Sequence, residues 1–231
     1  MSDSWKKYYF ERHMRSSAKS YTNRLCIAGK TLFGETISEI EIQNLHNNIG
    51  RLLTEAKTEF VGIIEVGCGT AITTEMLIEL VPNIPIRAID PIKENITVCK
   101  GLKLKHEGGI EFQIGEAQNI ETLRPKNHLV FMYEVIQHMK RSDFAKFVDK
   151  CFSNDVHSIV CGGVPDIDQR IVFYEGRHNI PKLNGDADDV IGTWYSREFF
   201  VSLSSKIQVQ YFDQLDLYTA PYRFDVILSQ K

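Results

Sequence analysis

The stretch Ile63-Ile64-Glu65-Val66-Gly67-Cys68-Gly69-Thr70-Ala71 decides the fold of this chain. It includes the end of a nearly continuous apolar run that starts at Phe60 and is rich in β-branched residues, a pattern typical of a strand covered on both faces. Gly67 and Gly69 permit a positive φ and let the backbone approach a ligand closely. A helical pattern follows from Thr73 to Leu80, and the amides at such a helix start attract an anionic group such as a carboxylate. The stretch therefore predicts a strand, a tight turn and a helix, with a ligand at the turn.

Strand and helix patterns alternate along the rest of the chain. Further strands are predicted at Ile86–Ile89, Ile110–Ile114, His128–Tyr133, Val156–Cys161, Ile207–Phe212 and Phe224–Leu228. Further helices are predicted at Ile92–Leu104 and Arg197–Leu203. One more is predicted to begin at Thr36, which forms a capping box with Glu39, and another to follow Ser142 as its cap. This alternation predicts an α/β fold with a mostly parallel, seven-stranded sheet and helices on both faces. No helical pattern separates the last two strands, so we expect them to form a C-terminal antiparallel hairpin.

The length and composition fit one domain. The chain has 231 residues, of which 43% are hydrophobic and 25% charged, enough to bury a sizeable core. We expect a single domain over residues 1–231, extended by a leading segment at 1–35 and an insert at 163–193. Loops as long as this insert are functional or disordered, and its aromatic residues favour an ordered cap.

Charge and cysteine content exclude several classes of protein. The net charge of -3 gives no overall positive field to hold nucleic acid or an anionic membrane surface. No apolar run has the length needed to cross a bilayer, and the start of the chain lacks the apolar core of a signal peptide, so we expect a cytoplasmic protein. Five cysteines without a CxxC pair argue against a disulfide framework or a zinc site. The expected partner is therefore a small molecule.

Asp90 makes the glycine turn more informative. It ends the second predicted strand, where an acidic side chain can accept hydrogen bonds from both hydroxyls of a ribose. A solvated turn aspartate before Pro91 is the alternative. A dinucleotide fingerprint would need a small residue at position 72, and this chain has Ile72, which disfavours NAD. No GxxxxGK(S/T) sequence is present to hold a triphosphate, so a carboxylate-bearing nucleoside without phosphates fits better.

The residues from Glu65 to Ala71 resemble the first motif of class I S-adenosylmethionine-dependent methyltransferases, a family with a Rossmann-like sheet. Asp90 matches the ribose-binding acid of that family, and Gly115-Glu116-Ala117 resembles its segment beside the adenine. Tyr133-Glu134-Val135-Ile136-Gln137-His138 resembles its fourth-strand motif, and the closing hairpin is also similar. The likeness covers roughly residues 60–231, with Ala71 in place of the third motif glycine.

This resemblance implies S-adenosylmethionine as the cofactor and a set of residues that hold it. Gly67 and Gly69 would flank the methionine part, Asp90 would hold the ribose, Ile92 would press on the adenine, and Glu116 or its backbone neighbours would read the adenine edge. The full cofactor set on the sheet is Glu65, Gly67, Cys68, Gly69, Asp90, Pro91, Ile92, Gly115, Glu116, Ala117 and Tyr133. Ordinary core packing is the alternative for Ile92 and Ala117, and an exposed loop acid is the alternative for Glu116.

Three residues are candidates for catalysis. A hydroxyl acceptor must lose a proton, and a histidine near its unperturbed pKa is a natural proton acceptor. His138 follows the fourth strand at the predicted cofactor edge and is the leading candidate, with a capping or packing histidine as the alternative. Glu134 is the competing base or cofactor ligand, and His178 in the insert could overlie the acceptor or be solvated.

The insert and the leading segment supply candidates for acceptor and cofactor contacts. Asp166, Asp168, Arg170, Tyr174 and Trp194 combine hydrogen-bonding groups with flat apolar faces, a mixture that suits a sugar ring. A solvated loop with buried aromatic anchors is the alternative. Similar methyltransferases fold a leading segment over the cofactor as a lid. Lid candidates are Tyr8 and Tyr9 toward the substrate and Arg12 and Tyr21 toward the cofactor; a helix packed on the core or on a second subunit of a homodimer is the alternative. The acidic run at Asp186, Asp188 and Asp189 does not by itself predict a metal.

The sequence thus indicates a methyltransferase that transfers a methyl group to a hydroxyl of a small polar acceptor. The insert and Gly192-Thr193-Trp194-Tyr195-Ser196 resemble methyltransferases of bacterial surface-polysaccharide biosynthesis, which favours a sugar or sugar nucleotide. The alternatives are a nucleotide-dependent oxidoreductase and a non-catalytic protein that binds S-adenosylmethionine.

Overall fold

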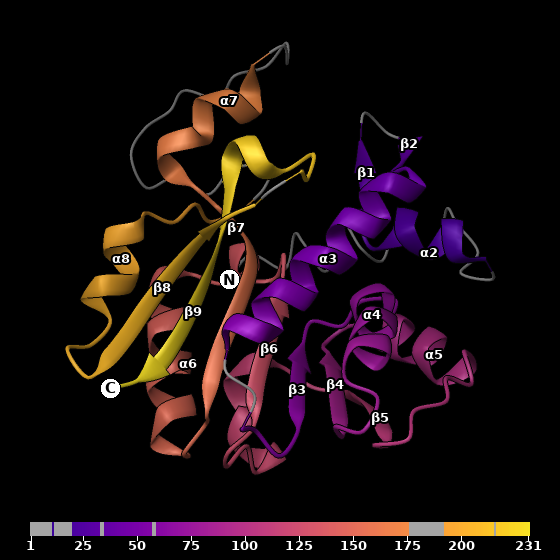
Figure 1. Ribbon diagram of the computed structural model, residues 1–231, viewed down its shortest axis with the longest axis horizontal. Coiled ribbons are helices and arrows are strands. Elements are labelled where there is room, and N and C mark those ends of the chain that lie inside the picture. Colours follow the sequence, from indigo (N-terminus) through magenta and orange to yellow (C-terminus); the bar gives the residue numbers. More distant parts are fainter. Residues whose placement is uncertain (1–10, 12–19, 33–34, 57–58, 176–191, 215) are drawn as a thin grey trace.

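The fold is described from a computed structural model that covers residue 11 and residues 20–32, 35–56, 59–175, 192–214 and 216–231. Its centre is a seven-stranded sheet with the order β5-β4-β3-β6-β7-β9-β8 (Figure 1). The strands are β3 (Ile63–Val66), β4 (Ile86–Asp90), β5 (Ile110–Ile114), β6 (Leu129–Tyr133), β7 (Ser158–Pro165), β8 (Ile207–Asp213) and β9 (Arg223–Gln230). The first five strands are parallel, and β9 runs antiparallel to both of its neighbours, β7 and β8. This arrangement confirms the predicted sheet and its C-terminal hairpin.

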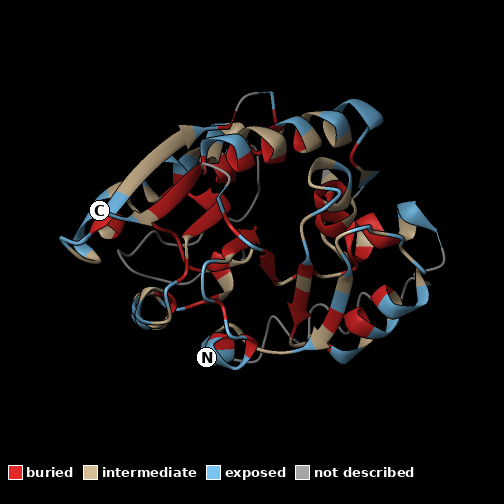
Figure 2. Cartoon of the chain, turned by 60° about the horizontal axis from the view of Figure 1, so that its bottom comes forward, coloured by how far each residue is buried: buried red, intermediate tan, exposed pale blue. Residues whose placement is uncertain are grey.

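Two helical layers cover the sheet. One face carries α3 (Glu39–Glu55), α4 (Ile72–Leu80) and α5 (Lys93–Gly101), and the other carries α6 (Arg141–Ser153), α8 (Arg197–Ser202) and the 3-10 segment η1 (Ala117–Leu123). Successive residues of β3 alternate between the layers: Ile63 packs with α3 and α4, and Ile64 with α6. The strands are mostly buried and the exposed residues lie on the outer sides of the helices (Figure 2).

Short elements surround the carboxyl ends of the parallel strands. They are α2 (Tyr21–Ile27), β1 (Thr31–Leu32), β2 (Glu35–Thr36), η2 (Ile136–His138), η3 (Ile167–Gln169), α7 (Arg170–Tyr174) and η4 (Ala220–Tyr222). In Figure 1, α7 lies above β7, while α2 and the β1–β2 ribbon lie above α4. The leading segment and the insert therefore both contribute to the end of the sheet at which ligands of α/β proteins bind.

Some predicted boundaries were wrong for identifiable reasons. β7 continues to Pro165 instead of ending at Cys161, because Gly162 and Gly163 form a bulge within the strand. The insert therefore starts after Pro165, and its residues 176–191 lie outside the described residues. Thr36 belongs to β2, and the side chain of Ser38 caps α3 by accepting from the amide of Glu41. Ser142 lies inside α6, whose N-cap is Lys140.

In the part of the chain that the structure describes, no helix has both the length and the apolar character that crossing a bilayer requires. The five cysteines are all free thiols.

Candidate functional site

A cavity of about 330 Å³ lies at the carboxyl ends of β3, β4, β5 and β6. Its walls come from the leading segment, the glycine turn and the loops that follow these strands. The lining residues are Ile27, Ala28, Lys30, Val66, Gly67, Cys68, Gly69, Ile72, Thr73, Asp90, Pro91, Ile92, Asn95, Gly115, Glu116, Ala117, Gln118, Tyr133, Glu134, Val135, His138 and Met139. Its size and its mixture of apolar and charged walls suit a small-molecule ligand.

The glycine turn forms one wall and depends on its glycines. The amides of Gly67 and Cys68 donate to the carbonyl of Ile89 at 2.7 and 3.1 Å, which ties the turn to β4. Gly67 has a φ of 75°, and a Cβ there would lie 2.5 Å from Cγ2 of Val135. Gly69 has a φ of 55°, and a Cβ there would meet no atom within 4 Å. Side chains are thus excluded where the turn meets the β6 loop, and the backbone is exposed to the cavity at Gly69.

Ala71 completes the turn in a left-handed conformation, with a φ of 66°, just before α4. The turn therefore forms although the third motif glycine is missing. The cost of this conformation for an alanine is on the order of 1–2 kcal/mol.

Asp90 fixes the turn and lines the cavity at the same time. Its Oδ2 accepts from the amide of Gly69 at 2.9 Å, and its Oδ1 accepts from the amide of Ile92 at 2.8 Å and from Nδ2 of Asn95 at 3.0 Å. The residue is only 5% exposed. These bonds hold the carboxylate in one orientation at the end of β4, in the position predicted for a ribose ligand.

Most of the predicted cofactor residues meet at this cavity. Gly67, Cys68, Gly69, Asp90, Pro91, Ile92, Gly115, Glu116, Ala117 and Tyr133 all line it. Glu65 and Tyr21 do not. Glu65 is buried in β3 and accepts hydrogen bonds from Oγ1 of Thr73 and, at 2.5 Å, from Oγ1 of Thr74. Tyr21 lies on the outside of α2 with 37% of its surface exposed.

Burial dominates the ionisation of Glu65 and raises its pKa to about 7, despite the two threonine hydroxyls that favour the charged form. Glu65 was predicted as a cofactor residue, but it does not line the cavity, because the alternation of β3 directs its carboxylate to the α4 layer.

Glu134 and His138 both line the cavity, as the sequence predicted. Glu134 has a left-handed φ of 54°, and its Oε2 lies 2.6 Å from Nζ of Lys30. Burial opposes its ionisation, but the nearby Lys30 and Arg223 charges hold its pKa below the usual value. Burial, assisted by the charge of Arg223, lowers the pKa of His138 to about 4. The expected histidine with an unperturbed pKa is therefore a neutral imidazole over the whole physiological range.

Lys30 is a cavity residue that the sequence analysis missed. Its side chain is only 6% exposed, and its Nζ lies 4.8 Å from the ring centroid of Tyr133 as well as against Glu134. Nothing in the local pattern distinguishes it from an exposed lysine, because both partners are more than one hundred positions away in the sequence.

The leading segment that carries Lys30 is anchored to the glycine turn. Arg24 of α2 donates to the carbonyl of Thr70 at 3.0 Å and to both carboxylate oxygens of Glu75 at 2.9 Å. Oγ1 of Thr70 donates back to the carbonyl of Arg24 at 2.9 Å. Ile27 and Ala28 are thereby placed over the cavity, so residues 27–30 form part of its wall.

The candidates for acceptor binding pack elsewhere. Asp166 caps η3 by accepting from the amide of Asp168 at 3.0 Å. Tyr174 and Trp194 are buried in an aromatic cluster with Phe173, and the guanidinium of Arg170 lies 5.9 Å from the ring centroid of Trp194. Asp166, Asp168, Arg170, Tyr174 and Trp194 are all absent from the cavity lining given above. Tyr174 and Trp194 therefore fit the alternative interpretation of this region, in which its aromatic side chains are buried anchors.

Four predicted site residues, Tyr8, Tyr9, Arg12 and His178, lie outside the described residues, as does the acidic run at Asp186, Asp188 and Asp189. Across the ranges that are described, no group of three or more His, Cys, Asp or Glu side chains is arranged to hold a metal ion.

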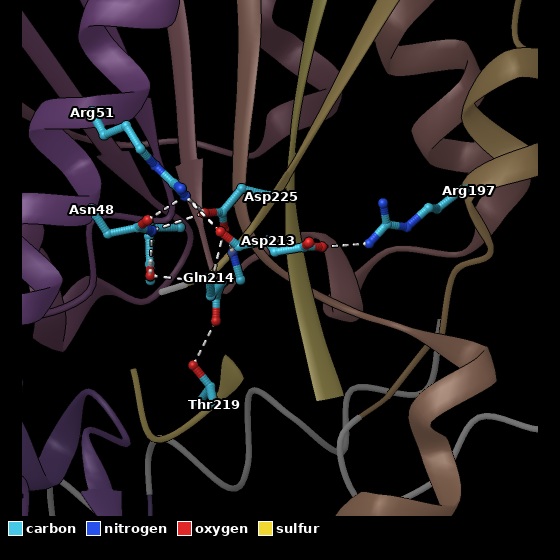
Figure 3. A network of polar contacts seen from close by, with 9 residues as sticks. Asn48, Arg51, Arg197, Asp213, Gln214, Thr219 and Asp225 are labelled. Carbon is cyan, nitrogen blue, oxygen red and sulfur yellow. Dashed lines mark hydrogen bonds and ion pairs between the residues drawn. The ribbon is translucent and has the colours of Figure 1, made fainter. Parts of the chain in front are cut away.

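A buried polar network around Asp225 (Figure 3) reaches the hydroxyl of Tyr133 on the cavity wall. Asp225 of β9 is fully buried and accepts at 2.8 Å from Nδ2 of Asn48, from Nε2 of Gln214 and from the amide of Gly163. The same Asn48 and Gln214 nitrogens lie 3.4 and 3.3 Å from the hydroxyl of Tyr133. The network therefore joins α3, the β7 bulge and β9 to a residue of the cavity wall.

Comparisons with known proteins agree with this geometry. Residues 63–154 match a family model described as a methyltransferase domain. A search of curated proteins finds no match. The match and the sheet topology together support the resemblance to class I S-adenosylmethionine-dependent methyltransferases, whereas a resemblance to sugar O-methyltransferases is not shown by them.

Among solved structures, the chain is similar to the magnesium protoporphyrin IX methyltransferase ChlM from Synechocystis PCC 6803, with a TM-score of 0.60 and 11% identity over 99% of this chain and 97% of that one. It is similar to the plantazolicin methyltransferase BamL, with a TM-score of 0.60 and 13% identity over 97% and 90%. It is also similar to the methyltransferase domain of bacterial CtHen1, with a TM-score of 0.58 and 14% identity over 81% and 97%. At these identities the comparisons show a shared fold.

Proposed function

We propose that this protein is an S-adenosylmethionine-dependent methyltransferase that acts on a small polar acceptor, with oxygen as the acceptor atom. The observation that carries the proposal is the cavity wall made by the Gly67–Gly69 turn and the Asp90 carboxylate, fixed to one another by the bond from the amide of Gly69. One ChlM structure contains bound SAH, and a second ChlM structure contains SAM.

The residues of the cavity fit this cofactor. Gly69 leaves the backbone open where a Cβ would meet nothing within 4 Å, and Ile92 adds a buried apolar wall next to Asp90. Ile72 is 2% exposed and lines the cavity at the start of α4, where a dinucleotide site needs a small residue. This placement favours a nucleoside without a pyrophosphate over NAD.

When bound, S-adenosylmethionine supplies a methyl group on a positively charged sulfur, which an acceptor lone pair can attack. The protein's part is to hold the reacting atoms in line and to keep water out. His138 follows β6 on the cavity wall and is proposed to lie beside the acceptor. A neutral ring nitrogen of His138 is proposed to take the proton of a hydroxyl acceptor. The lowered pKa keeps the ring neutral at any pH above about 4, and it also makes the ring a weaker base than an unperturbed histidine.

The hydroxyl of a sugar or glycosyl nucleotide is the first acceptor class to test. This acceptor class rests on the resemblance of the insert to methyltransferases of surface-polysaccharide biosynthesis. The packing of Tyr174 and Trp194 in an aromatic cluster weighs against it, because this packing removes two of the faces on which a sugar ring would stack. The size of the cavity and its mixture of apolar and charged walls still favour a small molecule over a macromolecule as acceptor.

The cofactor class is tested by calorimetry with S-adenosylhomocysteine, S-adenosylmethionine and NAD. We expect binding of the two adenosyl amino acids and none of NAD. Tight binding of NAD alone would replace the proposal by a nucleotide-dependent oxidoreductase. Binding of S-adenosylmethionine without release of S-adenosylhomocysteine, in the presence of glycosyl nucleotides and other small hydroxyl compounds, would favour the non-catalytic alternative.

Replacement of His138 tests its role in turnover. We expect His138→Ala to slow methyl transfer to a hydroxyl acceptor by about two to four orders of magnitude, because the proton would lose its acceptor. Wild-type turnover should show no inflection from this group near pH 6.5, because its neutral form persists down to about pH 4. His157→Ala is the control, because His157 directly precedes β7, at the end of that strand away from the cavity, and this variant should leave turnover unchanged. Full activity of His138→Ala would remove this residue from the mechanism.

A further inference from the structure

The charged groups on the cavity wall are unevenly placed. Asp90 ends β4, Glu116 follows β5, and Lys30 and Glu134 meet beside the end of β6. Of the cavity residues in the described ranges, Lys30 is the one lysine or arginine. It comes from the leading segment and lies outside residues 63–154, so the methyltransferase family match assigns it no role.

Lys30 and Glu134 form an ion pair that is unusually enclosed. The two side chains are 6% and 15% exposed and their charged atoms lie 2.6 Å apart. Taking both charges out of water is costly, and the attraction between them does little more than offset this cost. Apolar residues would close this wall at least as stably, so the pair points to a ligand with charges of its own.

The pair lies at the Gly67 end of the cavity. Val135, next to Glu134, packs so closely on Gly67 that a Cβ at Gly67 would lie 2.5 Å from it. The Asp90 carboxylate, in contrast, is held by Gly69, Ile92 and Asn95. One elongated ligand that has its sugar at Asp90 would therefore present its other end to Lys30 and Glu134.

We propose that Lys30 and Glu134 exchange partners when the cofactor binds: Lys30 receives the α-carboxylate of its amino-acid end and Glu134 receives the α-ammonium. This inference rests on the proposed function and adds the residues that recognise the zwitterion. One positive and one negative protein group then meet one negative and one positive ligand group, so the amino-acid end adds no net charge to the enclosed site, and only the sulfonium of the methyl donor does. The cost of opening the ion pair is offset by two new charge-assisted contacts.

The surrounding structure allows this exchange with little movement. The amide of Lys30 donates to the carbonyl of Leu25 at 2.9 Å, and its carbonyl accepts from the amide of Ile37 at 3.2 Å, so the backbone is fixed and only the side chain has to turn. Glu134 is fixed in a left-handed conformation against Gly163, where a Cβ would lie 2.6 Å from its Cγ. The anchored Glu134 and the longer, flexible Lys30 side chain are suited to these two roles.

The test compares two nucleosides that differ in the amino-acid end. S-adenosylhomocysteine carries the α-amino and α-carboxyl groups, and 5′-methylthioadenosine lacks both. By calorimetry, the wild type should bind the first about 10- to 100-fold more tightly. Lys30→Met should remove most of this preference while leaving the affinity for 5′-methylthioadenosine within about twofold. Lys126→Met, which breaks an exposed ion pair with Asp155 at 3.6 Å, is the matched control and should keep the wild-type preference.

A double variant keeps the test decisive, because Lys30→Met alone leaves a buried carboxylate unpaired and can prevent folding. Lys30→Met combined with Glu134→Gln removes both charges and should bind both nucleosides with nearly equal affinity. If this variant keeps the wild-type preference for S-adenosylhomocysteine, or loses affinity for both nucleosides equally, the exchange of partners is wrong. A wild type that binds neither nucleoside would instead reject the proposed function.

Discussion

At the scale of single residues, Glu65 shows how an ionisable group is used for packing beside the cavity. It lies in the central strand of the parallel region, is 1% exposed, and is held by the hydroxyls of Thr73 and Thr74 at the start of α4. Burial raises its pKa, and the nearby Asp90 charge adds to this effect. The protonated form therefore suits the folded state, and the ionised form opposes it.

This shift predicts a pH dependence of stability. The pKa of Glu65 is about 7 in the folded protein, above the ordinary 4.5. Its stabilising contribution is therefore complete below about pH 4.5 and is lost as the pH rises through 7. Glu65→Gln should increase the free energy of unfolding at pH 8 by about 2 kcal/mol and change it little at pH 5. Urea denaturation at the two pH values measures this difference.

Glu111→Gln is the control, since Glu111 is an exposed glutamate in β5. Its effect on unfolding should be small and the same at pH 5 and pH 8. Equal effects of Glu65→Gln at both pH values would show that Glu65 is ionised in the folded state at no cost.

At the scale of elements, α2 depends on contacts with the rest of the fold. It has 7 residues, too few for a helix that is stable alone. Its cap is Ser20, and Arg24 joins it to Thr70 and Glu75 through side-chain contacts that are largely buried. These contacts set the position of Lys30 on the cavity wall, so the order of α2 and the shape of the cavity should change together.

Arg24→Met tests this dependence. Loss of the bonds to Thr70 and Glu75 should release α2, so amides in residues 21–30 should exchange hydrogen at least about tenfold faster. The affinity for S-adenosylhomocysteine should fall as well, because Ile27, Ala28 and Lys30 line the cavity. Arg197→Met breaks the exposed pair with Asp213 and is the control for loss of an arginine. Unchanged exchange in residues 21–30 would mean that apolar packing alone holds α2.

The elements themselves were largely predictable. Local periodicity predicted all seven strands of the sheet, because each is an apolar run between turn residues. It did not predict β1 and β2, which have two residues each and carry no detectable period. Gly162 and Gly163 were interpreted as the end of a strand, whereas pairing with β9 carries the strand through a bulge. Tertiary pairing decides such positions, and the local sequence does not contain it.

The candidate site divides in the same way. The glycine turn, Asp90 and the β6 motif lie within short segments whose chemistry depends on neighbouring residues, and they were predicted. Lys30 enters the cavity through contacts with residues far away in the sequence, so no local signal was available. Trp194 was expected at a ligand and instead packs with Phe173, because an aromatic side chain serves both purposes and the sequence does not distinguish them.

At the scale of the whole molecule, the Asp225 network joins parts that are distant in sequence. Asn48 and Arg51 of α3, Gly163 of the β7 bulge, and Gln214 after β8 all meet one carboxylate. Burial raises the pKa of Asp225, and the hydrogen bonds from its neighbours oppose this. The Asp225 carboxylate therefore connects the helical layer that contains α3 to the antiparallel end of the sheet.

Removal of this connection should destabilise the fold strongly. We expect Asp225→Ala to reduce the free energy of unfolding by about 3 kcal/mol, because it leaves several buried donors without their acceptor. Asp213→Ala, at a carboxylate 78% exposed, should cost less than about 1 kcal/mol and serves as the control. Chemical denaturation at pH 8 measures both. Similar small losses for the two variants would show that water or other groups replace the Asp225 contacts.

The strand order has a consequence for the synthesis of the protein. β9 is made after β8 yet lies between β7 and β8, and β8 pairs with β9 alone in the described sheet. While the ribosome is still translating residues 223–230, β8 has no template to which it can add. A chain released by a premature stop in this short stretch would have two open strand edges, which are substrates for chaperones and for aggregation.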